Sequence, residues 1–290
     1  MIYFIILLKI LNKNVIMKLI LSFALFCIAF CLNSNAQADF YSLQALGDRY
    51  IYNSKYFNEP REIQVYRSGV NATLESDSLL TIYVFDAQYP PTFNLFCSTF
   101  ELIYPNVPCV IVGVSNPNRQ SELTPPYTDF DSVSGYDNPG KADSLLLSLK
   151  NEVIPFIKSK YGTSSRILLA GHSLGGTFVT YAMLVNPDLF RCILAVSPNY
   201  VYSQRMMIDR ITCFADECHE NCSLYIYLAN GKKDKMEESF TPEIKKAADI
   251  FSNCSEIVLN YDSLNIEKHS HTIFEGYSDT DSLDEFVRRH

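Results

Sequence analysis

Six short runs of apolar residues constrain the fold of this 290-residue chain more than any other feature. Their apolar side chains are nearly continuous instead of alternating with polar ones, which is typical of strands buried on both faces of a sheet. Segments of helical or turn-like character separate the runs, so the pattern predicts a mostly parallel sheet with helices on both faces. The sequence therefore indicates a three-layer α/β fold. The runs occupy residues 79–85, 108–114, 166–170, 191–197, 224–230 and 256–261.

Outside these runs, periodicity predicts one more strand and several helices. Residues 61–68 alternate between apolar and polar side chains, so we expect an antiparallel edge strand there. Residues 143–162 place apolar side chains, Phe156 among them, on one helical face. Gly162 is expected to cap this helix and Pro155 to kink it. Further helices are expected at residues 239–253 and 281–289.

The first 38 residues have the layout of a targeting segment. From Met17, a basic residue and an apolar run lead to an Ala-Gln-Ala sequence that ends at Ala38, which is typical of a cleaved secretory signal peptide. We therefore expect residues 1–38 to be removed, with Met17 as an alternative initiator, and residues 39–290 to form one secreted or periplasmic domain. An uncleaved anchor is the alternative. No later stretch reaches the roughly 18 apolar residues that span a bilayer.

The charge of the chain argues against a nucleic-acid partner. Its formal net charge is −8 at pH 7, and its basic residues form no stripe that could follow a phosphate backbone. No internal repeat, low-complexity tract or long linker divides the residues that follow the leader. These features are typical of a single acidic globular domain.

A serine between glycines stands where the third apolar run meets a segment of helical spacing, in Gly171-His172-Ser173-Leu174-Gly175. This G-x-S-x-G string is common by chance, but a strand entering it and a helix leaving it are the setting of a nucleophile elbow. Glycines two residues to either side relieve the crowding of such a turn, and the helix directs N–H groups towards developing negative charge. The pattern predicts that Ser173 is a nucleophile. A glycine-rich turn without chemistry is the alternative.

A serine hydroxyl needs a base to remove its proton. In hydrolases with such an elbow, the nucleophile is followed along the chain by Asp or Glu and then by His. His269 and His271 lie after the last apolar run and before the last expected helix, so either can be the base.

The acid that orients the base is expected after the fifth apolar run. Asp234 lies just beyond that run and a glycine turn, and this position makes it the predicted acid. Glu237 and Glu238 are close enough in the chain to compete for the role.

Together with the late histidine, five stretches of the chain resemble one esterase branch of the α/β hydrolases. They are "TIYVFDAQ", "VIVGVSNPNRQSELTP", "EVIPFIKSKYG", "AGHSLGGTF" and "NPDLFRCILAVSPNY", in matching order across residues 50–290. The branch includes enterochelin and salmochelin esterases, feruloyl and acetylxylan esterases, S-formylglutathione hydrolase and the mycolyltransferases. The resemblance implies an α/β-hydrolase fold and ester hydrolysis without a metal or an organic cofactor.

The resemblance also implies roles for individual residues. The backbone N–H groups of Leu174 and Gln88 match the oxyanion-hole donors, although Ala87 replaces a glycine that is common in the family. Arg119 matches an arginine at the mouth of the active site, with a loop salt bridge as the alternative. Family members carry Ser or Thr and an apolar residue shortly after the base, which favours His269 over His271.

The family often has a tryptophan beside its acyl pocket, and this chain contains none. Tyr200 and Tyr202 follow the corresponding Ser-Pro sequence and are candidates to line the pocket, with plain packing as the alternative. The expected function is a secreted serine esterase that acts on a small-molecule or carbohydrate-linked ester through an acyl-enzyme. Acyl transfer by the same triad and a non-catalytic binding protein on this scaffold are the alternatives.

The cysteines divide into two groups. The first group is expected to consist of small buried hydrophobes and comprises Cys97, Cys109 and Cys192. The second lies in loops or at element ends of a chain expected to meet an oxidising compartment, so we expect at least one disulfide within it. Its members are Cys213, Cys218, Cys222 and Cys254. A zinc site that includes His219 is the alternative, but the cysteine spacing departs from that of common zinc motifs.

Overall fold

The computed structural model describes residues 47–68, 79–126, 140–163, 165–217, 223–231 and 235–263. The chain divides into two compact units, residues 1–44 and 45–290, and every described residue belongs to the second. The expected signal peptide and the helix expected at residues 281–289 lie outside the described residues.

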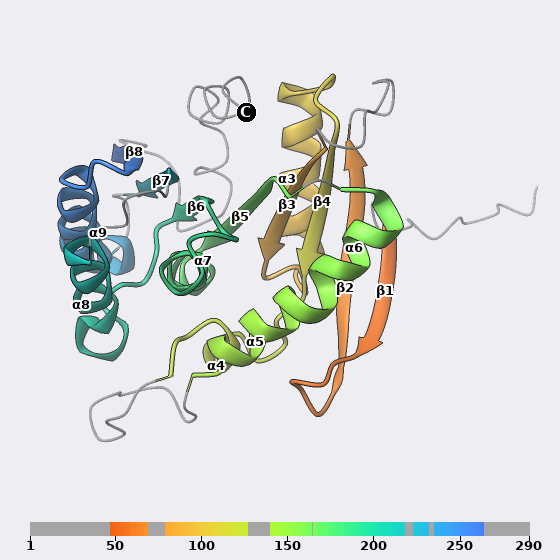
Figure 1. Ribbon diagram of the computed structural model, residues 1–290, viewed down its shortest axis with the longest axis horizontal. Helices are drawn as coiled ribbons and strands as arrows, with labels where there is room; N and C mark the ends of the chain where they lie inside the picture. Colours follow the sequence, from red (N-terminus) through yellow and green to blue (C-terminus); the bar gives the residue numbers. More distant parts are fainter. Residues whose placement is uncertain are drawn as a thin grey trace, which may run out of the picture. The chain divides into compact units, whose positions relative to one another are not determined.

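An eight-stranded sheet forms the centre of the second unit (Figure 1). Its strands lie in the order β1-β2-β4-β3-β5-β6-β7-β8; β1, β2 and β4 pair antiparallel, and the remaining pairs are parallel. All six apolar runs form strands of this sheet, as predicted. The bounds are β1 Asp48–Asn53, β2 Pro60–Ser68, β3 Leu80–Phe85, β4 Cys109–Val114, β5 Ile167–His172, β6 Cys192–Val196, β7 Leu224–Asn230 and β8 Ile257–Ser263.

The predicted edge position of residues 61–68 is wrong, although their antiparallel pairing is confirmed. They form β2, which lies between β1 and β4, and β1 is the edge strand. The apolar pattern of the sequence does not predict β1, because the residues of this strand are mostly exposed. Its most apolar member, Ile51, is 75% exposed.

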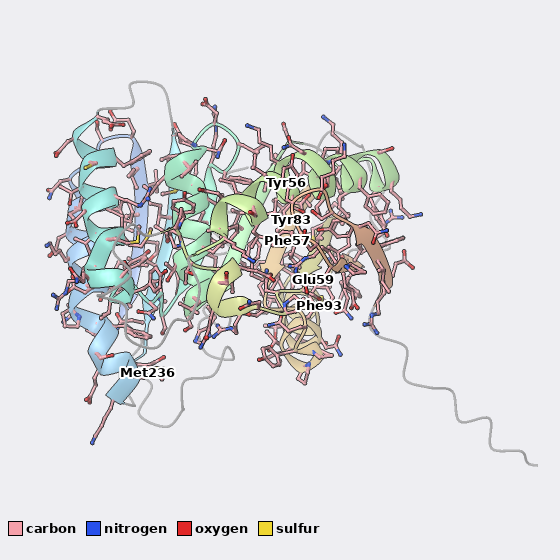
Figure 2. The ribbon with its side chains drawn as sticks, turned by 90° about the horizontal axis from the view of Figure 1, so that it is seen from below. Tyr56, Phe57, Glu59, Tyr83, Phe93 and Met236 are labelled. Carbon is pink, nitrogen blue, oxygen red and sulfur yellow. The ribbon has the colours of Figure 1, made fainter. Side chains whose placement is uncertain are left out.

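The helices pack on both faces of the sheet and complete the predicted three layers (Figure 1). One core cluster lies between α3 and the sheet and contains Phe93. The other contains Tyr83 and lies between the sheet and the helices from α5 through α9. Both residues are labelled in Figure 2. Among the described residues, no helix has the length and apolar character that a membrane span requires. The bounds are α3 Pro90–Ile103, α4 Arg119–Glu122, α5 Ala142–Ser148, η3 Leu149–Val153, α6 Ile154–Tyr161, α7 Leu174–Val185, α8 Tyr202–Asp216 and α9 Lys235–Ser252.

The helical segment expected at residues 143–162 contains a π-helical turn, η3, that ends two residues before Pro155. Gly162 ends the segment at φ 65°, as predicted for a helix cap. The extra residue in the π turn shifts the buried face by one position. Ile157 therefore lies in the core, whereas Phe156, predicted on the buried face, is exposed and contacts the ring of Tyr50 edge-on.

The parallel arrangement of β3 to β7 brings the carboxyl ends of five strands to one edge of the sheet. Ligands of open α/β sheets bind at this edge. Three residues that directly follow adjacent strands have positive φ there: Asp86 (65°) after β3, Ser173 (56°) close after β5 and Ser197 (42°) after β6. Strained backbone of this kind gathers at functional sites, so this edge is the candidate active site.

Candidate active site

Ser173 stands at the turn between β5 and α7, with φ 56° and ψ −117°. Its N–H donates to the Val196 carbonyl of β6 at 2.9 Å, and its carbonyl accepts the N–H of Asn199 at 3.2 Å. A Cβ at Gly171 would overlap the Gly175 carbonyl, so only glycine fits there. The Ser173 hydroxyl hydrogen-bonds to no other described residue, and 8% of the residue is exposed. The predicted strand–elbow–helix geometry is therefore present.

The predicted oxyanion donors lie in the segments that follow β5 and β3. Leu174 is the first residue of α7, and Gln88 lies in the loop after β3. A Cβ at Gly175 would lie 3.7 Å from both Asp86 Oδ2 and Phe85 Cβ, which places the end of β3 against the first turn of α7. Within the described part of the chain, the backbone N–H groups of Leu174 and Gln88 form no hydrogen bond. Both groups can therefore donate to a bound ligand.

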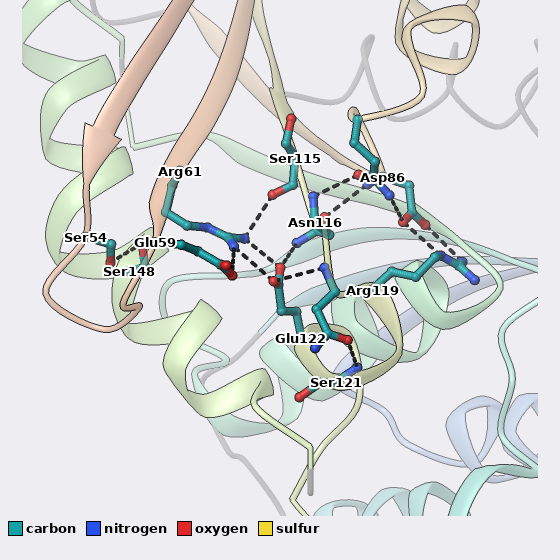
Figure 3. A network of polar contacts seen from close by, with 12 residues as sticks. Ser54, Glu59, Arg61, Asp86, Ser115, Asn116, Arg119, Ser121, Glu122 and Ser148 are labelled. Carbon is teal, nitrogen blue, oxygen red and sulfur yellow. Dashed lines mark hydrogen bonds and ion pairs between the residues drawn. The ribbon is translucent and has the colours of Figure 1, made fainter. Parts of the chain in front are cut away.

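Arg119 forms a loop salt bridge, which was the alternative to the predicted role at the mouth of the active site. Its Nε and Nη2 donate to the two carboxylate oxygens of Asp86 at 3.0 and 3.1 Å (Figure 3). The side-chain Nε2 of Gln88 donates to the same carboxylate at 3.0 Å. The Arg119 side chain remains 31% exposed beside this ion pair. Contact between Arg119 and substrate stays a prediction.

Two of the three candidate acids are described, and they differ in burial. Glu238 is exposed, whereas Glu237, in the first turn of α9, is 7% exposed. Glu237 Oε1 accepts a hydrogen bond from the Ser197 hydroxyl at 2.9 Å, and a Cβ at Gly231 would overlap its carboxylate. The carboxylate therefore lies between the ends of β6 and β7, at the edge that carries Ser173. Asp234 lies outside the described residues.

The other predicted site residues are placed as follows. Tyr200 is fully buried, and its hydroxyl shares a 2.7 Å hydrogen bond with Thr180 on α7. Burial raises the pKa of this hydroxyl above its usual value. The placement is that of a packing residue and gives no support to the predicted contact between Tyr200 and substrate. His269 and His271 lie outside the described residues.

The described cysteines include the three predicted buried hydrophobes, and Cys97, Cys109 and Cys192 are all buried. Cys213, which is exposed, and Cys254, which is half-buried, are free thiols, whereas Cys218 and Cys222 lie outside the described residues. A disulfide in the second group therefore stays a prediction. No cluster of three or more potential metal ligands occurs in the described ranges.

The parallel sheet, the elbow after β5 and the helix that follows it define an α/β-hydrolase fold with a serine at the nucleophile position. Residues 54–277 match the model of the family described as "Putative esterase". Because this match covers more than half of the chain, the protein belongs to that esterase family.

Curated relatives share parts of the chain. The siderophore enterobactin esterase of Emericella nidulans is 32% identical over 111 residues, which cover 35% of this chain and 37% of the relative. The ferri-bacillibactin esterase BesA of Bacillus subtilis is 25% identical over 147 residues, which cover 46% of this chain and 51% of the relative. The chain therefore spans between about a third and a half of the length of the curated relatives it matches.

Solved structures with a similar fold cover most of the chain. The siderophore hydrolase EstA from Aspergillus nidulans has a TM-score of 0.65 at 19% identity and covers 83% of this chain and 94% of its own. An IroE-like serine hydrolase from Shewanella oneidensis has a TM-score of 0.69 at 18% identity and covers 83% of this chain and 80% of its own. At such low identity the likeness shows the shared fold.

Proposed function

We propose that this protein is a serine hydrolase that cleaves ester bonds of siderophores through an acyl-enzyme on Ser173. The observation that carries the proposal is the strained elbow at Ser173, whose hydroxyl forms no hydrogen bond to another described residue and which is followed directly by α7. The siderophore class is supported by the names of the relatives and of the structural neighbours. The leader supports a location outside the cytoplasm, secreted or periplasmic.

In the proposed reaction, the Ser173 oxygen attacks the ester carbonyl while a histidine, His269 or His271, accepts the hydroxyl proton. The carbonyl oxygen becomes an oxyanion that accepts hydrogen bonds from the N–H groups of Leu174 and Gln88. Collapse of this intermediate releases the alcohol, which takes the proton from the histidine. Water, activated by the same histidine, then attacks the acyl-enzyme, releases the acid and restores Ser173.

A panel of esters tests this function. The full chain is incubated with enterobactin, ferri-bacillibactin, a feruloyl ester and acetylated xylan, and released acid and alcohol are measured by chromatography. We expect Ser173-dependent hydrolysis, with kcat/KM for the siderophores at least about tenfold above that for the other esters. A higher value for the feruloyl or acetyl ester would overturn the substrate class. An absence of Ser173-dependent hydrolysis throughout the panel would overturn the function.

We further propose Glu237 as the acid of the triad, with Asp234 as the alternative. A triad acid is buried and accepts hydrogen bonds that fix its carboxylate, so that it can orient the imidazole and stabilise the imidazolium. The burial of Glu237, its bond from Ser197 and its position after β7 support this role.

Substitution of the candidate acids discriminates between them. We expect Glu237→Gln to lower kcat by about a thousandfold or more, because a neutral amide no longer stabilises the imidazolium. Asp234→Asn and the exposed control Glu238→Gln should leave kcat within about threefold of the wild type. Steady-state kinetics on the three purified variants provide the measurement. A larger loss in Asp234→Asn would transfer the role to Asp234.

A further inference from the structure

We propose that Asn116 is a positioning residue for the oxyanion hole: it holds the loop Asp86–Gln88 in the conformation that presents the Gln88 N–H to the substrate. The inference rests on the proposed function, because an oxyanion donor matters only if Ser173 forms an acyl-enzyme. Asn116 itself is fully buried and follows β4, the strand next to β3.

Asn116 contacts the loop at both ends, and Figure 3 shows its contact with Asp86. Its side-chain Oδ1 accepts the backbone N–H of Asp86 at 3.1 Å, and its own N–H donates to Gln88 Oε1 at 2.8 Å. The Gln88 amide closes the loop by donating to Asp86 Oδ1 at 3.0 Å. The side chain of Gln88 is thereby held between Asn116 and Asp86, and its backbone N–H is left without a partner among the described residues.

The loop needs such support because its first residue is strained. Asp86 has φ 65°, a conformation that is strained for a residue other than glycine. A strained residue persists only where its surroundings hold it. Ala87, which replaces the common family glycine, adds one backbone bond to the Val114 carbonyl at 3.1 Å. Asn116 supplies two further hydrogen bonds to the loop Asp86–Gln88, one at each end.

The orientation of Asn116 is in turn set by a buried ion pair. Asn116 Nδ2 donates to Glu122 Oε2 at 3.3 Å, and Arg61 donates to both oxygens of the same carboxylate at 2.9 and 2.6 Å. Arg61 also donates to the Ser115 carbonyl at 3.0 Å. A backbone N–H only donates and a carboxylate only accepts, so the Asn116 amide satisfies both neighbours in one orientation alone. Asn116, Arg61 and Glu122 are each at most 2% exposed, where a wrong pairing is costly.

The substitution Asn116→Asp tests the inference. It keeps the size of the side chain but places a second carboxylate beside Glu122, so the loss of the donor and the charge repulsion should displace the contact with Asp86. Removing one oxyanion donor typically costs a hundredfold to a thousandfold in kcat. We expect a displaced donor to cost about tenfold to a hundredfold in kcat, with KM within about threefold of the wild type.

A matched control separates positioning from general damage. Asn118→Ala removes the side-chain cap of α4, a 3.4 Å bond from the Ser121 N–H, without touching the loop. It should lower the melting temperature and leave kcat unchanged.

The affinity for a boronic acid, which forms a tetrahedral adduct on the serine, supplies a readout that a purely structural role would not move. It should weaken in Asn116→Asp by the same factor as kcat. Gln88→Met removes both side-chain bonds of the loop and leaves the buried pair intact, so it should lower kcat about tenfold even if Asn116→Asp fails to fold.

Unchanged kcat and boronate affinity in a folded Asn116→Asp, or unchanged kcat in Gln88→Met, would overturn the positioning role. If the wild type keeps its Ser173-dependent hydrolysis in that case, the proposed function stands. A wild type without such hydrolysis would overturn the function and the inference together.

Discussion

Replacing Ser173 by alanine is expected to lower kcat for ester hydrolysis by about a million-fold, because loss of the nucleophile removes the acyl-enzyme route. The residual rate reflects binding and the oxyanion hole alone. Steady-state hydrolysis of a p-nitrophenyl ester by wild type and variant, at matched concentrations, measures the effect. Turnover near the wild-type rate in the variant would contradict the assignment of Ser173.

The fold should survive this substitution. The elbow is held by backbone bonds from Ser173 to Val196, Thr177 and Asn199, and the hydroxyl hydrogen-bonds to no other described residue. Alanine carries the same Cβ, so the strained φ costs both residues about the same. Matching circular-dichroism spectra and melting temperatures would show that the loss of activity is chemical.

Replacing the histidine that acts as base should have an effect of similar size, and His269 is the predicted base. We expect His269→Ala to lose kcat nearly as completely as Ser173→Ala, since members of a triad act as a unit. His271→Ala serves as the matched control and should stay within about threefold of the wild type. Added imidazole should restore part of the activity of His269→Ala, because a small base can occupy the vacated space.

The reverse ranking, with the larger loss in His271→Ala, would transfer the role to His271 and leave the triad in place. Small losses in both variants would show that neither histidine is the base.

The strands and the elbow were predictable because their signals are local. A nearly continuous apolar run such as residues 224–230 is typical of a strand covered on both faces of a sheet, and it forms β7 with the expected bounds. Gly171 lies near the end of β5 and Ser173 stands between that strand and α7, so the spacing of the two residues predicted the turn as well. Gly162 similarly marked the end of its helix.

Features that depend on distant partners could not be predicted in this way. Arg61 and Glu122 are separated by 61 positions, and a charged side chain gives no local sign that it will be buried in a pair. Asn116 becomes a candidate positioning residue only when that pair and the loop after β3 are seen together. The burial of Glu237, likewise, arises from the contact of α9 with the ends of β6 and β7.

Tyr200 shows a different case, in which a resemblance suggested a pocket position and the structure shows a buried packing residue. Its side chain is fully buried and its hydroxyl is hydrogen-bonded to Thr180 on α7, which gives no support to contact with substrate. The sequence left this packing open as the alternative, and no local pattern could have chosen between the two.

The covalent labelling of Ser173 tests the central claim most directly. The tryptic peptide of residues 167–191 contains a single serine, Ser173, so an adduct on its serine can be assigned without ambiguity. After reaction of the native full chain with a fluorophosphonate, we expect one added label, on Ser173 of this peptide, and no label in the Ser173→Ala variant. A label on another residue, or an unlabelled peptide from an active enzyme, would contradict the assignment of Ser173 as the nucleophile.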